Sequence, residues 1–173
     1  MIKSLTIALL VTGTSLLAET RDVYLESDDG DRTRIATLTL ADDGGYQVSM
    51  EGAAFADHFL SMRPFKCLEG PDKNWCHVPY PYEIARNISS DLVDLEYDFL
   101  FLWKKKTDYG IDMWNGIYYR IEDQGDALVG TLHEMDMDLL SAPPPAGVTR
   151  LLRAQDIHPS APEDHWLPRL VIQ

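Results

Sequence analysis

The most constraining feature of this 173-residue sequence is the pair Cys67 and Cys76, its only two cysteines. The eight residues between them include Gly70-Pro71-Asp72. This is a turn signal because glycine permits unusual dihedral angles, proline fixes one, and aspartate can bond back to the backbone. Two extended arms joined by such a turn form an antiparallel hairpin in which the cysteines face each other. We therefore predict one hairpin disulfide, Cys67–Cys76.

The first 18 residues are typical of a secretory signal peptide. Lys3 gives a positive start, residues 5–11 are apolar, and the segment ends in the small residue Ala18. The apolar run is too short to span a membrane, and no stop-transfer stretch follows it. We expect residues 1–18 to be removed and residues 19–173 to be secreted, into the periplasm, without a transmembrane segment; the alternative is an N-terminal core helix. An oxidising compartment favours a disulfide over free thiols.

The chain is acidic, with a formal net charge of −13. An acidic surface repels nucleic acid and anionic lipid, so we expect no nucleic-acid partner. The basic run Lys104-Lys105-Lys106 follows a very apolar segment, and we interpret it as a charged strand end, with a binding patch as the alternative. About 155 residues are enough for a single domain with its own core, which we place at 19–173.

Hydrophobic alternation with a period of two predicts strands along most of the chain. Residues 22–27, 32–40 and 46–50 read as a three-stranded meander because turn signals separate them. The strongest pattern covers residues 93–103, where every second residue is apolar and Asp94, Glu96 and Asp98 fall on the other face. We predict a strand there, since a helix would scatter these acids into the apolar stripe. Further strands are expected at 117–121, 127–137, 148–152 and 166–172.

Eight or nine short strands joined by tight turns, with almost no helical periodicity, predict an all-β antiparallel domain. Strands of eight to eleven residues favour an up-and-down barrel or closed meander of lipocalin-like architecture over a small sandwich. The likeness is one of architecture alone, because no Gly-x-Trp motif stands near the first strand. Residues 141–146, with three consecutive prolines, are expected to form an extended spacer.

Aromatic residues offer the best functional lead. They could line a pocket for a small apolar or planar ligand, and an arginine on the same face as two phenylalanines could meet an anionic group. The alternative is that the rings fill the core of a barrel too small to hold anything. The candidate ligand-binding residues are Arg63, Tyr80, Tyr97, Phe99, Phe101, Trp103 and Trp114.

A second candidate site is the segment 133–138. On a strand it places His133, Met135 and Met137 on one face, and imidazole with thioethers is the soft ligand set that suits copper(I). Three acids occupy the other face and would suit calcium if loop carbonyls joined them. The alternatives are that the methionines fill core gaps, that His133 is a satisfied core or rim histidine, and that the acids are a solvated face. A looser His and acid grouping lies at 158–165.

No sequence motif announces covalent catalysis. Gly-x-Ser-x-Gly, His-Glu-x-x-His and Walker-type loops are all absent, and no cofactor is predicted. We therefore expect an exported, soluble, non-catalytic β-barrel that binds a small ligand or acts as an accessory to an envelope protein. The alternatives are a periplasmic copper-type metal-binding protein and a cofactor-free enzyme with its site inside the barrel.

Overall fold

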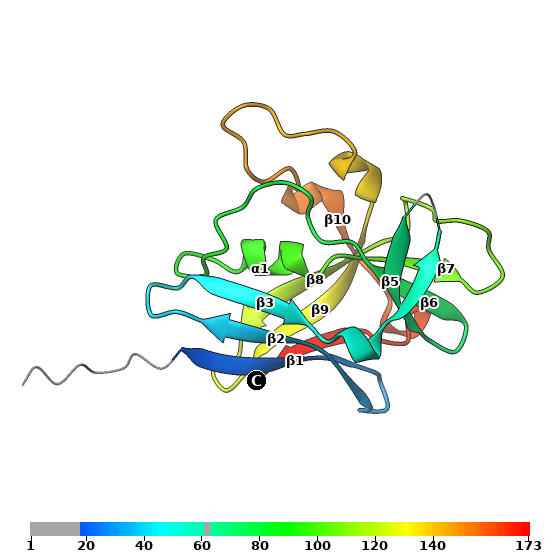
Figure 1. The fold of residues 1–173 in the computed structure, drawn as a ribbon, viewed down its shortest axis with the longest axis horizontal. Helices are drawn as coiled ribbons and strands as arrows, with labels where there is room; N and C mark the ends of the chain where they lie inside the picture. The colour runs from blue at the N-terminus through cyan, green and yellow to red at the C-terminus, as the bar shows by residue number, and fades with distance from the viewer. Residues whose placement is uncertain (1–17, 61–62) are drawn as a thin grey trace, which may run out of the picture.

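A computed structural model describes residues 18–60 and 63–173 of the chain (Figure 1). The expected signal peptide, apart from its last residue, lies outside the described residues. Within the described part, no helix has the length and apolar character needed to cross a membrane.

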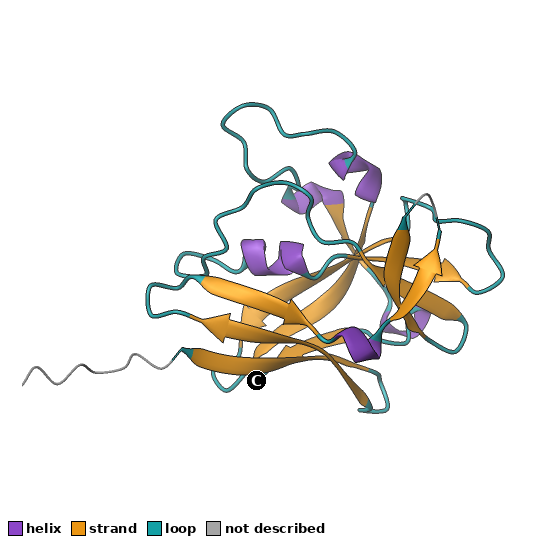
Figure 2. Ribbon diagram, viewed as in Figure 1, coloured by secondary structure: helices purple, strands orange, loops and turns teal. Residues whose placement is uncertain are grey.

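The fold is one antiparallel sheet of eleven strands that curls into a half-barrel (Figures 1 and 2). The strands are β1 (Glu19–Glu26), β2 (Arg32–Leu40), β3 (Tyr46–Met50), β4 (Ala56–Phe59), β5 (Pro64–Glu69), β6 (Lys73–His77), β7 (Phe101–Lys105), β8 (Gly116–Asp123), β9 (Leu128–Met135), β10 (Ile157–Pro159) and β11 (Arg169–Ile172). One short α-helix, α1 (Val93–Asp98), lies over the sheet, and the 3-10 turns are η1 (Gly52–Ala54), η2 (Met137–Leu140), η3 (Ala154–Asp156) and η4 (Pro162–Asp164).

The strand order is β3-β2-β1-β11-β9-β8-β7-β6-β5-β4, with β10 paired to β9 outside this path. In the described part of the chain no pairing joins β3 to β4, so the ends of the sheet stay apart. The prediction of an all-β antiparallel domain is confirmed. The sheet is a half-barrel, whereas an up-and-down barrel or closed meander was expected.

The cysteine hairpin is confirmed. Cys67 of β5 and Cys76 of β6 are directly opposite and form the disulfide, and both residues are fully buried. Gly70 in the turn is not needed for an unusual backbone dihedral angle, which is the usual reason for a glycine in a turn. Its φ is not in the left-handed region, but a Cβ there would lie 2.4 Å from the Trp166 ring. Glycine is therefore required because Trp166 packs directly on the backbone.

The strand prediction for residues 93–103 is wrong in its first half, because residues 93–98 form α1 and only Phe101–Lys105 is a strand. The period-two argument assumed that Asp94, Glu96 and Asp98 face solvent. All three are instead buried, at 1%, 5% and 6% exposure. A helix buried on every side has no solvated face, so its acids need specific partners rather than water.

Two hydrophobic clusters use the two faces of β7, β8 and β9. The first cluster fills the concave side and includes Trp75, Phe101 and Tyr119. The second lies on the opposite face, around Tyr97 and Tyr118, and is covered by residues 78–84 and by the chain from η2 to β10. Helix α1 contributes to both clusters. The middle strands are therefore buried on both faces over part of their length, which explains apolar runs such as residues 116–119 of β8.

Candidate functional site

The predicted ligand-binding aromatics divide between the two clusters instead of lining one space. Tyr80 and Tyr97 belong to the second cluster, with ring centroids 4.4 Å apart. Phe99 and Phe101 belong to the first cluster, and both are fully buried. These four rings pack against other side chains, as in an ordinary core.

The other three predicted ligand-binding residues lie nearer the surface. Arg63 is exposed, and Trp114 is 75% exposed in the loop before β8. Trp103 of β7 is half-buried against the first cluster. Only Trp103 lies beside the groove described below.

The predicted metal ligands are also distributed. Met135 and Met137 are buried in the second cluster, and both contact the position of Gly116. The half-buried His133 instead has Nδ1 3.0 Å from the carbonyl oxygen of Thr131. Among residues 18–60 and 63–173, no three His, Cys, Asp or Glu side chains are placed to share a metal ion. The copper-type site stays a prediction.

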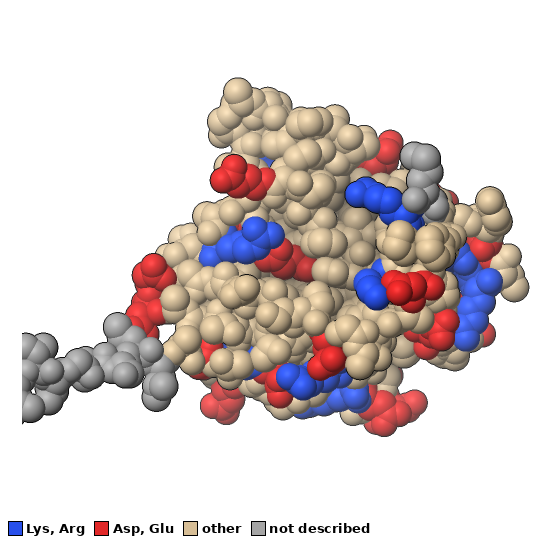
Figure 3. All heavy atoms as spheres, in the orientation of Figure 1, with Lys and Arg blue, Asp and Glu red and all other residues tan. Residues whose placement is uncertain are grey.

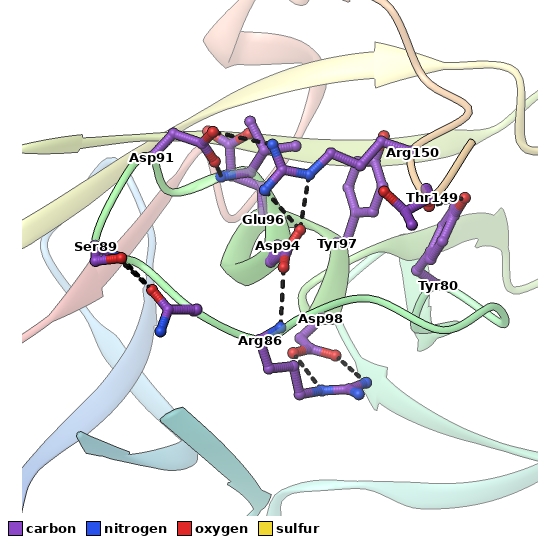
Figure 4. A network of polar contacts seen from close by, with 12 residues as sticks. Tyr80, Arg86, Ser89, Asp91, Asp94, Glu96, Tyr97, Asp98, Thr149 and Arg150 are labelled. Atoms are coloured by element: carbon purple, nitrogen blue, oxygen red, sulfur yellow. Dashed lines mark hydrogen bonds and ion pairs between the residues drawn. The ribbon is translucent and has the colours of Figure 1, made fainter. Parts of the chain in front are cut away.

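Two arginines, one shortly before α1 and one far along the chain, neutralise two acids of α1 (Figure 4). Arg150 lies 2.7 Å from Asp94 and also pairs with Asp91, at 2.9 Å. Arg86 lies 2.9 Å from Asp98, and its backbone N–H donates to Asp94. Asp94 and Asp98 are four residues apart and so share a helical face, which lets the two arginines clamp one side of α1.

The third acid of α1 points elsewhere. Glu96 accepts a hydrogen bond from the hydroxyl of Tyr118 and one from the backbone N–H of Ile121, at 2.7 Å. Burial raises the pKa of Glu96 above its usual range, and burial also raises the pKa of Tyr118. Both carboxylate oxygens are occupied inside the core. These contacts fasten α1 to β8 and leave no free group for a ligand.

Two tyrosines of the second cluster hold the chain between η2 and β10, which covers that cluster. The hydroxyl of Tyr80 donates to the carbonyl of Thr149; both residues are drawn in Figure 4. The hydroxyl of Tyr97 donates to the carbonyl of Leu152 and accepts from its backbone N–H. Arg86 adopts a φ of 49°, the only positive value outside glycine in the described residues. Left-handed backbone costs a non-glycine residue about 1–2 kcal/mol, and here the ion pair with Asp98 offsets that cost. We call the contacts of Asp94, Glu96 and Asp98 the α1 network; its role is structural, because it holds α1 to β8 and to the chain around Arg86 and Arg150.

A groove of about 500 Å³ lies where the β1–β2 turn, the β5–β6 turn and the segment before β11 meet. Four other surface hollows have volumes of about 310 to 380 Å³. We call the groove of about 500 Å³ the acidic groove, because six of its lining residues are acids. Its lining consists of Ser27, Asp28, Asp29, Asp31, Thr33, Pro71, Asp72, Lys73, Glu163, Asp164, His165, Trp166 and Leu167. Figure 3 shows that acidic and basic side chains are scattered over one face of the molecule, with groups of both signs near its middle.

Four aromatic side chains pack together beneath and beside the acidic groove, and we call them the aromatic floor. Trp75 contacts His165 and Trp166, with ring centroids 5.7 and 6.3 Å apart, and His165 also contacts Trp103, at 5.8 Å. These packings are edge-to-face, the geometry that aromatic rings prefer. Two members, His165 and Trp166, line the groove itself.

The aromatic floor holds an unusual concentration of unpartnered polar atoms. In the described residues five buried side-chain nitrogen or oxygen atoms lack a hydrogen-bond partner, and four of them are the indole Nε1 atoms of Trp75, Trp103 and Trp166 and Nδ1 of His165. Buried polar groups are normally satisfied, so a cluster of exceptions calls for a physical explanation. Edge-to-face contacts can turn an indole N–H toward a neighbouring ring, but they leave the imidazole lone pair unused.

The protonation of His165 follows from its surroundings. Its side chain is 1% exposed, and Nε2 lies 2.8 Å from a carboxylate oxygen of Glu134. Burial lowers the pKa of His165, and the carboxylate opposes this only in part. The neutral ring then donates from Nε2 to Glu134, which leaves Nδ1 as a hydrogen-bond acceptor.

Among the described residues, Lys73 is the one lysine or arginine that lines the acidic groove. Its Nζ donates to the carbonyl oxygen of Asp164, at 2.7 Å, and lies 4.2 Å from the ring centroid of Trp103. The second distance is that of a cation–π contact. The groove already holds one ammonium group between a carbonyl and an indole face.

Sequence reasoning named parts of this groove without joining them. Residues 28–31 and 70–72 were recognised as turns, and 158–165 as a loose His and acid grouping. Because these segments lie far apart in the chain, only the curl of the sheet brings them together. No family model matches the chain, and no curated protein or solved structure is significantly similar to it.

Proposed function

We propose that this chain is an exported, non-catalytic binding module that holds a small ligand in the acidic groove. One observation carries the proposal: a groove of about 500 Å³ lies over buried, unpartnered nitrogen atoms of His165 and Trp166. A ligand pocket of ordinary size has a volume of about 300–1,000 Å³ and combines aromatic walls with a few convergent polar groups. The acidic groove has both features.

Binding is favoured over catalysis by where the perturbed groups lie. Glu96 and Tyr118 have raised pKa values, but they bond to each other in the core. In the groove, burial lowers the pKa of His165. The Nε2 of His165 is engaged by Glu134, and its neutral ring can accept a hydrogen bond from a ligand through Nδ1.

Export is supported by the layout of residues 1–18 and by the disulfide between Cys67 and Cys76. Disulfides persist in secreted and periplasmic proteins and are rare in reducing compartments. The lipocalin-like comparison stays one of architecture, since the proposed ligand lies at the end of an open half-barrel and not inside a closed one.

The test is a thermal-shift screen on the mature protein, with separate sets of organic cations, sugars, carboxylates and apolar compounds. The matched variant is Thr33→Trp, which places an indole in the groove from a half-buried strand position. We expect at least one compound to raise the melting temperature of the wild type and to have no effect on the variant. If no compound in the screen distinguishes the two proteins, the proposed function is wrong.

A further inference from the structure

The charge of the acidic groove is one-sided. Its six carboxyl side chains belong to three segments and are opposed there by the single ammonium of Lys73, and Asp28, Asp29 and Asp31 of the β1–β2 turn are all exposed. A concave surface lined by one sign of charge concentrates ions of the opposite sign. The groove therefore attracts cations and repels anions.

The carboxyl groups follow the rim rather than converge on one point. No three of the acids and histidines in the described residues are placed to share one metal ion. Carboxylates spread along a groove match a cation whose positive charges are also spread out, because each charge can then approach a carboxylate of its own.

The contact of Lys73 shows how the groove accommodates an ammonium group. Its Nζ is held by the carbonyl of Asp164, at 2.7 Å, and by the face of Trp103, with 4.2 Å to the centroid. Backbone carbonyls and indole faces are general ligands for alkylammonium groups, so a ligand ammonium can use the same kind of contact. Methylene groups between two ammonium groups would lie against the half-buried ring of Trp166.

His165 gives an independent indication of the ligand chemistry. The side chain is buried, its Nδ1 has no hydrogen-bond partner within the described residues, and its other ring nitrogen is occupied by Glu134. Because burial keeps the ring neutral, Nδ1 offers a lone pair and accepts from a hydrogen-bond donor. An ammonium supplies such donors, and a carboxylate or sulfate supplies none.

We infer that the acidic groove binds an aliphatic polyamine, an organic cation whose ammonium groups are separated by short methylene chains. The inference rests on the proposed function and adds the ligand class to it. The carboxylates of the β1–β2 turn and of Asp72 receive the outer ammonium groups, His165 accepts from the inner one, and Trp166 covers the methylene groups.

The test is isothermal titration calorimetry of the mature protein with spermidine as the probe, at about 20 mM and about 300 mM salt. The groove variant is Asp28→Asn/Asp29→Asn/Asp31→Asn, which removes charge from an exposed turn and keeps its shape. The matched control removes three exposed charges outside the groove, as Asp42→Asn/Glu122→Gln/Asp126→Asn. Both variants change the net charge by the same amount, so they separate local from general attraction.

We expect spermidine to bind the wild type and the control alike, and the groove variant at least about tenfold more weakly. The higher salt should weaken binding by a similar factor, because screening shortens the range of the rim charges. If the groove variant and the control lose spermidine affinity equally, the attraction is due to the net charge of the protein and the inference is overturned. If spermidine fails to bind while another compound is sensitive to Thr33→Trp, the polyamine assignment is wrong and the proposed function stands. If no compound is sensitive to that substitution, both are wrong.

Discussion

Replacing Arg150 with methionine tests whether the α1 network fastens the fold as we describe. Asp94 is 1% exposed, and its Oδ1 lies 2.7 Å from Nη2 and 2.8 Å from Nε of Arg150. Removing one partner of a buried ion pair costs about 3–5 kcal/mol, because the remaining charge is left uncompensated. The Arg150 side chain is 32% exposed, so water can reach part of the site, and Asp94 keeps the N–H of Arg86. We therefore expect a loss of about 3 kcal/mol, at the low end of that range.

The assay is urea unfolding at pH 7, followed by tryptophan fluorescence. We expect Asp94→Asn/Arg150→Met to be less destabilised than Arg150→Met alone, because the amide leaves no charge without a partner. Arg153→Met is the control, since the Arg153 side chain is 67% exposed and its one ion pair within the described residues is with Asp156. That control should unfold like the wild type. The reasoning fails if Arg150→Met is as stable as the Arg153→Met control. It also fails if the double variant loses as much stability as Asp94→Asn and Arg150→Met lose separately, added together.

Four further predictions concern Arg86, the disulfide and the buried histidines. Arg86→Gly should be more stable than Arg86→Ala by about 1 kcal/mol in urea unfolding, because both lose the Asp98 ion pair but only glycine is relaxed at a φ of 49°; equal stabilities would contradict this. Closing the loop between Cys67 and Cys76 contributes about 2.5–3 kcal/mol in the chain-entropy model, so the double serine variant should lose about that amount. Because both cysteines are fully buried, intact mass should show a gain of two hydrogens only when reductant is combined with denaturant; reduction in native buffer would refute the burial. Burial lowers the pKa of His77 and of His165, so the unfolded chain binds more protons below pH of about 6.5, and stability should fall as the pH decreases from there toward the folded-state values. The decline in melting temperature between pH 7 and 5 should be shallower in His77→Gln, and an unchanged slope would argue against a neutral, buried His77.

Local sequence signals predicted the parts of this fold that depend on local geometry. The hairpin of Cys67 and Cys76 follows from a turn signal and from counting residues across two strands. The meander β3-β2-β1 follows from the alternation of apolar and polar residues along its strands. A sheet with one buried face requires this alternation, because a register slip of one residue would turn every apolar side chain toward solvent. In each case the controlling contacts lie within a few residues of the turn.

Prediction failed where distant partners decide the outcome. Residues 93–98 alternate like a strand, yet they are helical because Arg86, Arg150 and the N–H of Ile121 receive their acids. No periodicity rule contains that information. The aromatic residues were predicted to bind a ligand, with core filling as the alternative, and which rings share a cluster depends on the face of the sheet that each occupies. The acidic groove was missed for the same reason, because the curl of the sheet assembles it from three separate segments.

The dependence of α1 on remote partners has a consequence for the time course of folding. The helix has six residues, its N-cap Leu92 makes no side-chain capping bond, and Asp98 stands at its carboxyl end, where negative charge opposes the helix dipole. Isolated helices shorter than about 12–15 residues are marginal in water even with favourable sequences. Residues 93–98 should therefore become helical only after β8 and the chain around Arg150 have reached them. In a pulsed hydrogen-exchange experiment, the amides of α1 should gain protection among the last in the molecule, so that their protection marks the completion of folding.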